Sequence, residues 1–190
     1  MNMPIIVRTT KTGKEESDVI SYAFTKKREI YLFDEVNNAV SESIIAQLNY
    51  LEEVGDEDIK LIINSPGGTV TAGLAIVDAM KRCKCDVSTV CTGMAASMAA
   101  VILSCGTVGK RYVTPLCEVM IHQPLGGVQG QATDIELVSN HIRKVKDKVN
   151  KLLSDNTQKT VDVIASDCER DYYMSADEAI DYGIVDDYYQ

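Results

Sequence analysis

Residues 59–91 read IKLIINSPGGTVTAGLAIVDAMKRCKCDVSTVC, and this stretch decides the fold class. Residues 59–63 form a short apolar run that the turn-forming residues 65–68 stop, which is typical of a buried strand. Apolar side chains then recur at helical spacing, so we expect a helix over about 70–83. Residues 87–91 alternate as a further strand. A strand, a helix and another strand in this order predict an α/β domain with substantially parallel strands.

The same alternation extends on both sides of this stretch. We expect further strands over 29–33 and 117–121, and further helices over about 44–51, 95–105, 133–154 and 175–183. The helix over 133–154 carries one apolar stripe, and Thr133 with Glu136 matches a capping box at its start. Residues 1–28 are polar and weakly patterned. We therefore expect an N-terminal arm over 1–28 and a single domain over 29–190.

Composition narrows the class of protein. The chain of 190 residues has a formal net charge of -9, which repels a phosphate backbone and disfavours nucleic-acid binding. No basic run would hold a membrane surface, and the longest apolar run, residues 94–105, is too short to cross a bilayer. The N-terminus lacks the apolar stretch of a secretory signal. These features predict a soluble, cytoplasmic protein.

The six cysteines fit that location. Several lie inside apolar runs, as reduced core cysteines do in cytosolic proteins. Cys83 and Cys85 form the only close pair, and neither a CxxC motif nor a nearby histidine completes a four-ligand zinc set. No phosphate-binding loop motif occurs in the right context. We therefore expect neither a metal nor a nucleotide cofactor.

Ser97 and His122 are the first candidates for chemistry. Ser97 lies after an expected strand and at the start of an expected helix, near free backbone N–H groups that would stabilise an oxyanion. It is not in a G-x-S-x-G elbow, because Ala95 and Ala99 replace the glycines, and such a serine is more often a packing residue. His122 ends an apolar strand before a glycine-rich loop, where it is a general base or, equally often, a structural histidine.

The remaining signals are weaker. Asp171 is a possible acid, but the residues themselves do not favour it over Asp167, Glu169 or Asp177. His141, the second histidine, lies among charged residues and is most simply a surface residue. Residues 65–69 (SPGGT) are either a plain tight turn or a loop whose N–H groups serve an oxyanion or an acyl thioester.

Taken together, these segments resemble the ClpP family of ATP-dependent proteases. The similarity runs from about Ile30 to Asp186. Residues 63–68 (INSPGG) resemble the oxyanion loop of the family and residues 93–98 (GMAASM) its nucleophile motif. Residues 118–127 (EVMIHQPLGG) resemble its base motif and substrate-binding strand, and Arg170-Asp171 its acid motif. Four motifs in the correct order make the resemblance specific.

The resemblance implies a serine endopeptidase. It makes Ser97 the nucleophile, His122 the general base and Asp171 the residue that orients the imidazole. The backbone N–H groups of Gly68 and Met98 would form the oxyanion hole. An extended peptide would pair with two flanking segments, whose residues are Gly68, Thr69, Val70, Leu125, Gly126 and Gly127.

The resemblance also implies a fold and partners. The fold would be ClpP/crotonase-like, an α/β fold with stacked β-sheets flanked by helices and a protruding handle over about 123–155. The chain would assemble with itself into two stacked heptameric rings and receive unfolded polypeptides from a hexameric AAA+ unfoldase, which uses the ATP. Departures from the family pattern at residues 14–18 and at Phe33-Asp34 concern the choice of that ATPase.

Two other functions share parts of this pattern. An acyl-CoA enzyme of the crotonase group would use the same oxyanion loop without a Ser-His-Asp set. A non-catalytic subunit would complete a mixed ring, although such subunits often lose a member of the triad and this chain keeps all three. Peptidase activity of the purified chain separates these alternatives.

Overall fold

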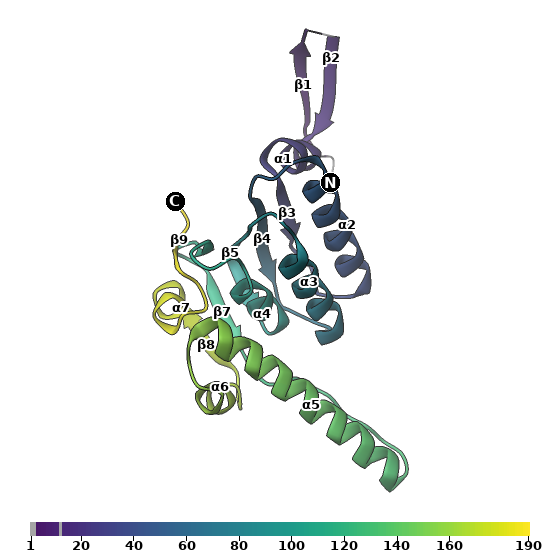
Figure 1. Ribbon diagram of the computed structural model, residues 1–190, viewed down its shortest axis with the longest axis vertical. Helices are drawn as coiled ribbons and strands as arrows, with labels where there is room; N and C mark the ends of the chain where they lie inside the picture. The colour runs from purple at the N-terminus through teal and green to yellow at the C-terminus, as the bar shows by residue number, and fades with distance from the viewer. Residues whose placement is uncertain (1–2, 12) are drawn as a thin grey trace.

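The computed structural model describes residues 3–11 and 13–190, which form nine strands and seven helices (Figure 1). The strands are β1 (Ile5–Thr10), β2 (Gly13–Asp18), β3 (Glu29–Leu32), β4 (Ile59–Ser65), β5 (Val87–Ala96), β6 (Arg111–Val113), β7 (Glu118–Ile121), β8 (Tyr172–Ser175) and β9 (Asp187–Tyr188). The helices are α1 (Val19–Lys27), α2 (Asn38–Val54), α3 (Val70–Arg82), α4 (Met98–Ser104), α5 (Ala132–Thr157), α6 (Val161–Asp167) and α7 (Ala176–Tyr182).

The main sheet confirms the predicted α/β class. Strands β3, β4, β5, β6 and β9 lie side by side in that order, and every neighbouring pair is parallel. The helices α2 and α3 connect successive parallel strands, as βαβ units require. Alternate residues of β4 are fully buried, and the side chains of Ile59, Leu61 and Ile63 form the centre of the core.

Strand β5 joins the two parts of the sheet. Its first half pairs with β6, whereas Met94–Ala96 pairs with β7, which in turn pairs antiparallel with β8. Gly93 lies between the two halves with φ 78°, a left-handed conformation that glycine adopts without strain. The expected strand over 87–91 is therefore longer, and the expected helix over 95–105 shortens to α4. Every residue of α4 is buried.

Two elements project from opposite ends of the molecule (Figure 1). One is the β1–β2 hairpin, an antiparallel ladder formed within the expected N-terminal arm, of which residues 1, 2 and 12 lie outside the described residues. The other is α5, which runs back from the projecting tip alongside the segment that follows β7 (Figure 1). The capping box expected at Thr133 is wrong, because the helix begins one residue earlier and its N-cap is Gln131. The corresponding box at Ser175 and Glu178 is confirmed.

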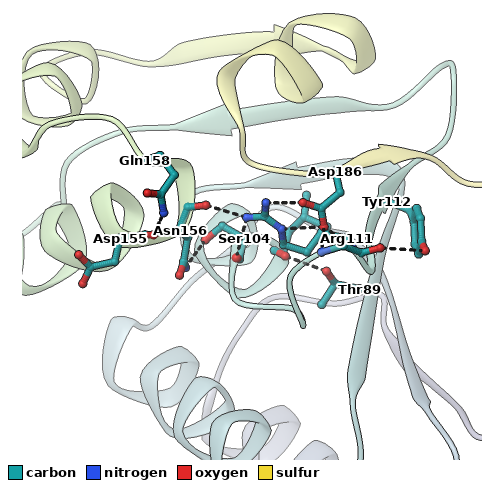
Figure 2. Close-up of polar contacts among 10 residues, drawn as sticks. Thr89, Ser104, Arg111, Tyr112, Asp155, Asn156, Gln158 and Asp186 are labelled. Carbon is teal, nitrogen blue, oxygen red and sulfur yellow. Dashed lines mark hydrogen bonds and ion pairs between the residues drawn. The ribbon is translucent and has the colours of Figure 1, made fainter.

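A buried arginine holds the base of α5 to the sheet (Figure 2). Arg111 forms two hydrogen bonds to the Asp186 carboxylate, at 3.0 Å from Nε and 2.6 Å from Nη2. Its Nη1 donates to the carbonyl oxygens of Ser104, at the end of α4, and of Asn156, in the last turn of α5. The Asn156 amide also donates to the Ser104 hydroxyl. One guanidinium therefore fixes the ends of α4 and α5 relative to β6 and the C-terminal segment.

Candidate active site

Ser97 has an unusual backbone conformation. It is the N-cap of α4, with φ 54° and ψ -122°, a region that residues other than glycine rarely occupy. The strand geometry of β5 holds it there, since the Ser97 amide donates to the Met120 carbonyl oxygen across the β5–β7 pair. Its side chain makes no capping bond, so the hydroxyl is presented outward. This is the strained strand-to-helix turn of a nucleophile elbow, formed here without the flanking glycines.

His122 follows β7 and lies beside that hydroxyl. Its Nε2 is 2.8 Å from Ser97 Oγ, and its Nδ1 is 3.0 Å from Asp171 Oδ1. The pairing register explains the second contact, because antiparallel strands β7 and β8 place Ile121 opposite Tyr172. The next residues outward on the two strands are then His122 and Asp171. The imidazole is 15% exposed, and the Asp171 side chain is 54% exposed.

The other acidic candidates are occupied or lie elsewhere. Asp167 accepts a hydrogen bond from the Tyr182 hydroxyl at 2.7 Å. Asp177 accepts one from the Tyr188 hydroxyl at 2.6 Å. Glu169 is exposed, and only its carbonyl oxygen contacts the site region. Among the described acidic residues, Asp171 alone makes a hydrogen bond to His122.

Gln123 ties the segment after β7 to the loop that carries Asp171. Its backbone amide donates to the Cys168 carbonyl oxygen at 2.7 Å, and its side chain donates to the Glu169 carbonyl oxygen at 3.0 Å. Lys146, from the middle of α5, donates to the Gln123 side-chain oxygen at 3.0 Å. The position of α5 is thereby linked to the strand and loop that hold the His122–Asp171 pair.

The loop between β4 and α3 packs against the Ser97 turn. A Cβ atom on Gly67, which has φ 89°, would lie 2.5 Å from the Ala96 carbonyl oxygen and 2.8 Å from both Met98 N and Ser97 Cβ. Such distances leave no room for a side chain. The loop is held from the other side, because the Ser65 hydroxyl donates to the Asp34 carbonyl oxygen and accepts from the Gly67 amide.

This contact leaves two backbone donors available near the serine. Among the hydrogen bonds of the described residues, neither the Gly68 nor the Met98 amide has a carbonyl partner, although their neighbours Thr69 and Ser97 do. Met98 opens α4, so its N–H lacks an intrahelical acceptor. Met98 N lies close to Gly67, the residue before Gly68. An oxyanion formed on a carbonyl attacked by Ser97 can accept from donors of this kind.

A cavity of about 500 Å³ opens beside Ser97 and His122. Four of the six expected substrate-binding residues, Gly68, Thr69, Val70 and Leu125, line it, whereas Gly126 and Gly127 do not. Gly126 instead lies against α5, where an added Cβ would be 2.8 Å from Ile142 Cδ1. His141 is exposed, as expected, but it also lines the cavity, which the sequence did not predict.

The Cys168 thiol, three residues before Asp171, is poorly suited to act as a nucleophile. Cys168 is buried below the Asp171 loop. Burial, with the nearby Asp167 charge, raises the pKa of this thiol to about 11, so it is neutral at physiological pH.

The described part of the chain has neither a cluster of metal-binding side chains nor a membrane-spanning helix. No group of three or more His, Cys, Asp or Glu residues is placed to hold a metal ion there. Within residues 3–11 and 13–190, no helix has both the length and the apolar character needed to cross a membrane.

A comparison with protein families assigns the chain to a known family. The sequence model of the family described as Clp protease matches residues 11–190. The chain belongs to the Clp protease family. It is therefore a peptidase, and its α/β architecture, with a mainly parallel sheet, is the expected ClpP fold. The match covers β2 and every later element, including β7 and β8, the strands next to His122 and Asp171.

Proposed function

We propose that this Clp protease chain is a serine endopeptidase whose nucleophile, base and orienting acid are Ser97, His122 and Asp171. The observation that carries the proposal is the continuous contact from Ser97 Oγ to His122 Nε2 at 2.8 Å and from His122 Nδ1 to Asp171 Oδ1 at 3.0 Å. A nucleophile, a base and an orienter within hydrogen-bond reach are the requirement for acyl transfer.

The proposed reaction has two steps. Ser97 Oγ attacks the scissile carbonyl carbon while His122 Nε2 takes the hydroxyl proton, and Asp171 stabilises the imidazolium. The Gly68 and Met98 amides donate hydrogen bonds to the oxyanion. His122 then gives its proton to the leaving amine, and the C–N bond breaks to leave an acyl-enzyme. A water molecule, deprotonated by His122, then attacks the ester carbonyl carbon. The bond to Ser97 Oγ breaks, His122 returns the proton to that oxygen, and the peptide leaves with a new carboxyl group.

Hydrolysis of a fluorogenic peptide tests this proposal. The wild-type chain should turn the peptide over, and Ser97→Ala should lower kcat by about 10⁴-fold or more, since the three residues act as a unit. An acyl-CoA enzyme or a non-catalytic ring subunit would show no serine-dependent peptide cleavage. Equal turnover by the wild type and Ser97→Ala would reject the serine mechanism.

We further propose that the chain works as a self-compartmentalised assembly of two stacked heptameric rings. A serine peptidase open to solution would attack the proteins around it, and an enclosed chamber prevents this. The projecting half of α5 supports such an interface, because Ile135 is 42% exposed and Leu137 is 64% exposed on it. Unfolded polypeptides would be supplied by a hexameric AAA+ unfoldase, since no nucleotide motif lies in this chain. We propose a cytoplasmic location, which six free cysteines suit.

The mass of the native assembly tests this second proposal. Ile135→Glu should split the double ring, because a charge at a buried apolar interface costs several kcal/mol. Val145 is a poorer choice for this test, since it lines the cavity beside Ser97. A wild-type chain that is fully active as a monomer, or that degrades stably folded proteins without ATP, would refute the compartment.

A further inference from the structure

The cavity beside Ser97 has mainly apolar walls. They are formed by Val70, Met120, Pro124, Leu125, Ile142 and Val145. A cavity of about 500 Å³ accommodates a large side chain. No aspartate, glutamate, lysine or arginine lines it. A charged side chain placed there would lose water without gaining an opposite charge, so the cavity is suited to neutral groups.

His141 brings a polar group to these apolar walls. It lies on α5 beside Ile142 and one turn before Val145, and all three line the cavity. No described residue makes a hydrogen bond or ion pair with its imidazole, whereas both ring nitrogens of His122 are engaged. A neutral imidazole carries one donor and one acceptor. His141 therefore offers both to whatever occupies the cavity.

We propose that His141 is a specificity-determining residue for the side chain on the acyl side of the scissile bond. It hydrogen-bonds the end of that side chain, so the enzyme favours long side chains with an apolar stem and a neutral polar tip. Tyrosine and glutamine fit this description. Phenylalanine and methionine are their matched partners, since they have similar length and lack the polar tip. The inference rests on the proposed peptidase function, because it needs cleavage next to this cavity.

The structure offers one competing source of such a bond. Thr69 and Thr71 also line the cavity with hydroxyl groups, and both are exposed. Thr69 is the N-cap of α3, and Thr71 lies in the first turn of that helix. A hydroxyl there is shorter and closer to the backbone than the imidazole. We therefore assign the longer reach to His141 and use Thr71 to test the assignment.

The experiment measures kcat/KM for four peptides that differ only at this residue: tyrosine, phenylalanine, glutamine and methionine. The readouts are the ratios of tyrosine to phenylalanine and of glutamine to methionine. One neutral hydrogen bond changes such a ratio by about two- to tenfold. His141→Leu should lower both ratios by that factor, and His141→Asn, which keeps a donor and an acceptor, should restore part of the loss.

Two control variants separate this effect from others. Asn140→Leu changes an exposed neighbour that does not line the cavity, so its ratios should equal those of the wild type. Thr71→Val removes the competing hydroxyl and should leave both ratios above those of His141→Leu. Ratios within one preparation do not depend on the fraction of chains that assemble.

The outcomes distinguish this inference from the proposed function. No cleavage of any of the four peptides by the wild type would reject the peptidase mechanism itself. Cleavage with ratios at or below one in the wild type would overturn the role of His141 alone. Ratios that are unchanged in His141→Leu, or that fall only in Thr71→Val, would overturn it as well.

Discussion

Gly67 offers a sharp test of how the oxyanion loop and the Ser97 turn depend on each other. An alanine Cβ at this position would lie 2.5 Å from the Ala96 carbonyl oxygen and 2.8 Å from Met98 N. Ordinary contact begins at 3.4 Å, so the loop and the turn must separate by about 0.6–0.9 Å, the difference between these distances. A shift of about 1 Å in a catalytic constellation costs about 10²-fold in rate. Gly67→Ala should therefore lower kcat/KM by about 10²–10³-fold, the loss that also follows removal of one oxyanion donor.

Gly109 provides the matched control. It has φ 83°, close to the 89° of Gly67, but an added Cβ there meets nothing within 4 Å. Both alanine variants therefore carry the same backbone strain, roughly 1–2 kcal/mol. Only Gly67→Ala adds an overpacking penalty, about 1–3 kcal/mol.

Peptide hydrolysis and thermal melting of both variants decide the outcome. Gly109→Ala should keep near-normal activity and a modestly lowered melting temperature. Gly67→Ala should melt lower still, by about 2–4 °C for each additional kcal/mol in a chain of this size. Normal kcat/KM in Gly67→Ala, or an equal loss of activity in Gly109→Ala, would refute the close-packing argument.

Three further predictions concern Ser97, Asp171 and the buried Arg111–Asp186 ion pair. Ser97→Gly and Ser97→Ala should both be inactive, but the glycine variant should unfold at the same or a higher urea concentration than the alanine variant. The reason is that φ 54° and ψ -122° strain a residue with a side chain by about 1–3 kcal/mol. A lower unfolding midpoint for the glycine variant would contradict this. Asp171→Asn should lower kcat by about 10⁴-fold with an unchanged circular dichroism spectrum, and near-normal peptide turnover would show that the acid lies elsewhere. Burial opposes ionisation of Asp186, but hydrogen bonds from Arg111 outweigh it and lower the pKa of the carboxyl below 3.8. A carboxyl group with a depressed pKa in the folded state stabilises the fold above its unfolded pKa, and this contribution is lost as the pH falls toward the folded pKa. In urea titrations, Asp186→Asn should therefore lose less stability than the wild type below about pH 4. Parallel acid profiles would argue against this contribution.

The regular part of the fold follows from sequence patterns. Strand β4 and helix α3 lie close to the ranges expected, because an apolar run, a Pro-Gly-Gly turn and helical spacing all agree there. The short strands β6, β8 and β9 were not anticipated. They span two to four residues each, and their pairing depends on partners distant in the chain.

The boundary at Ser97 shows why tertiary structure overrides local patterns. Residues 95 and 96 are alanines, which favour a helix, yet they extend β5 because β7 supplies a parallel partner. The resulting turn gives Ser97 its strained conformation, which no local motif indicated. Thr133 is likewise not a cap, because α5 begins at Ala132 with Gln131 as its N-cap.

The candidate site likewise combines features that local sequence predicts with features that only the tertiary structure reveals. The strand end at His122 and the loop at Gly67 could be picked from sequence, but the residues alone left Asp171 equal to its acidic neighbours. The β7–β8 register distinguishes Asp171, because it places this residue opposite His122. Local sequence does not reveal that register, since the two strands are about fifty residues apart in the chain. The contacts of Gln123 and the position of His141 in the cavity could not be predicted from sequence, because both depend on how α5 packs against the segment after β7.

The most direct test of the serine mechanism is to map the adduct of a fluorophosphonate probe by peptide mass spectrometry. The wild-type chain should carry one adduct, on Ser97, because among residues 3–11 and 13–190 only that hydroxyl makes a hydrogen bond to His122. His122→Ala should label far more slowly, and Ser97→Ala should not label. An adduct on Ser65 or Ser104, or undiminished labelling of Ser97→Ala, would contradict the account.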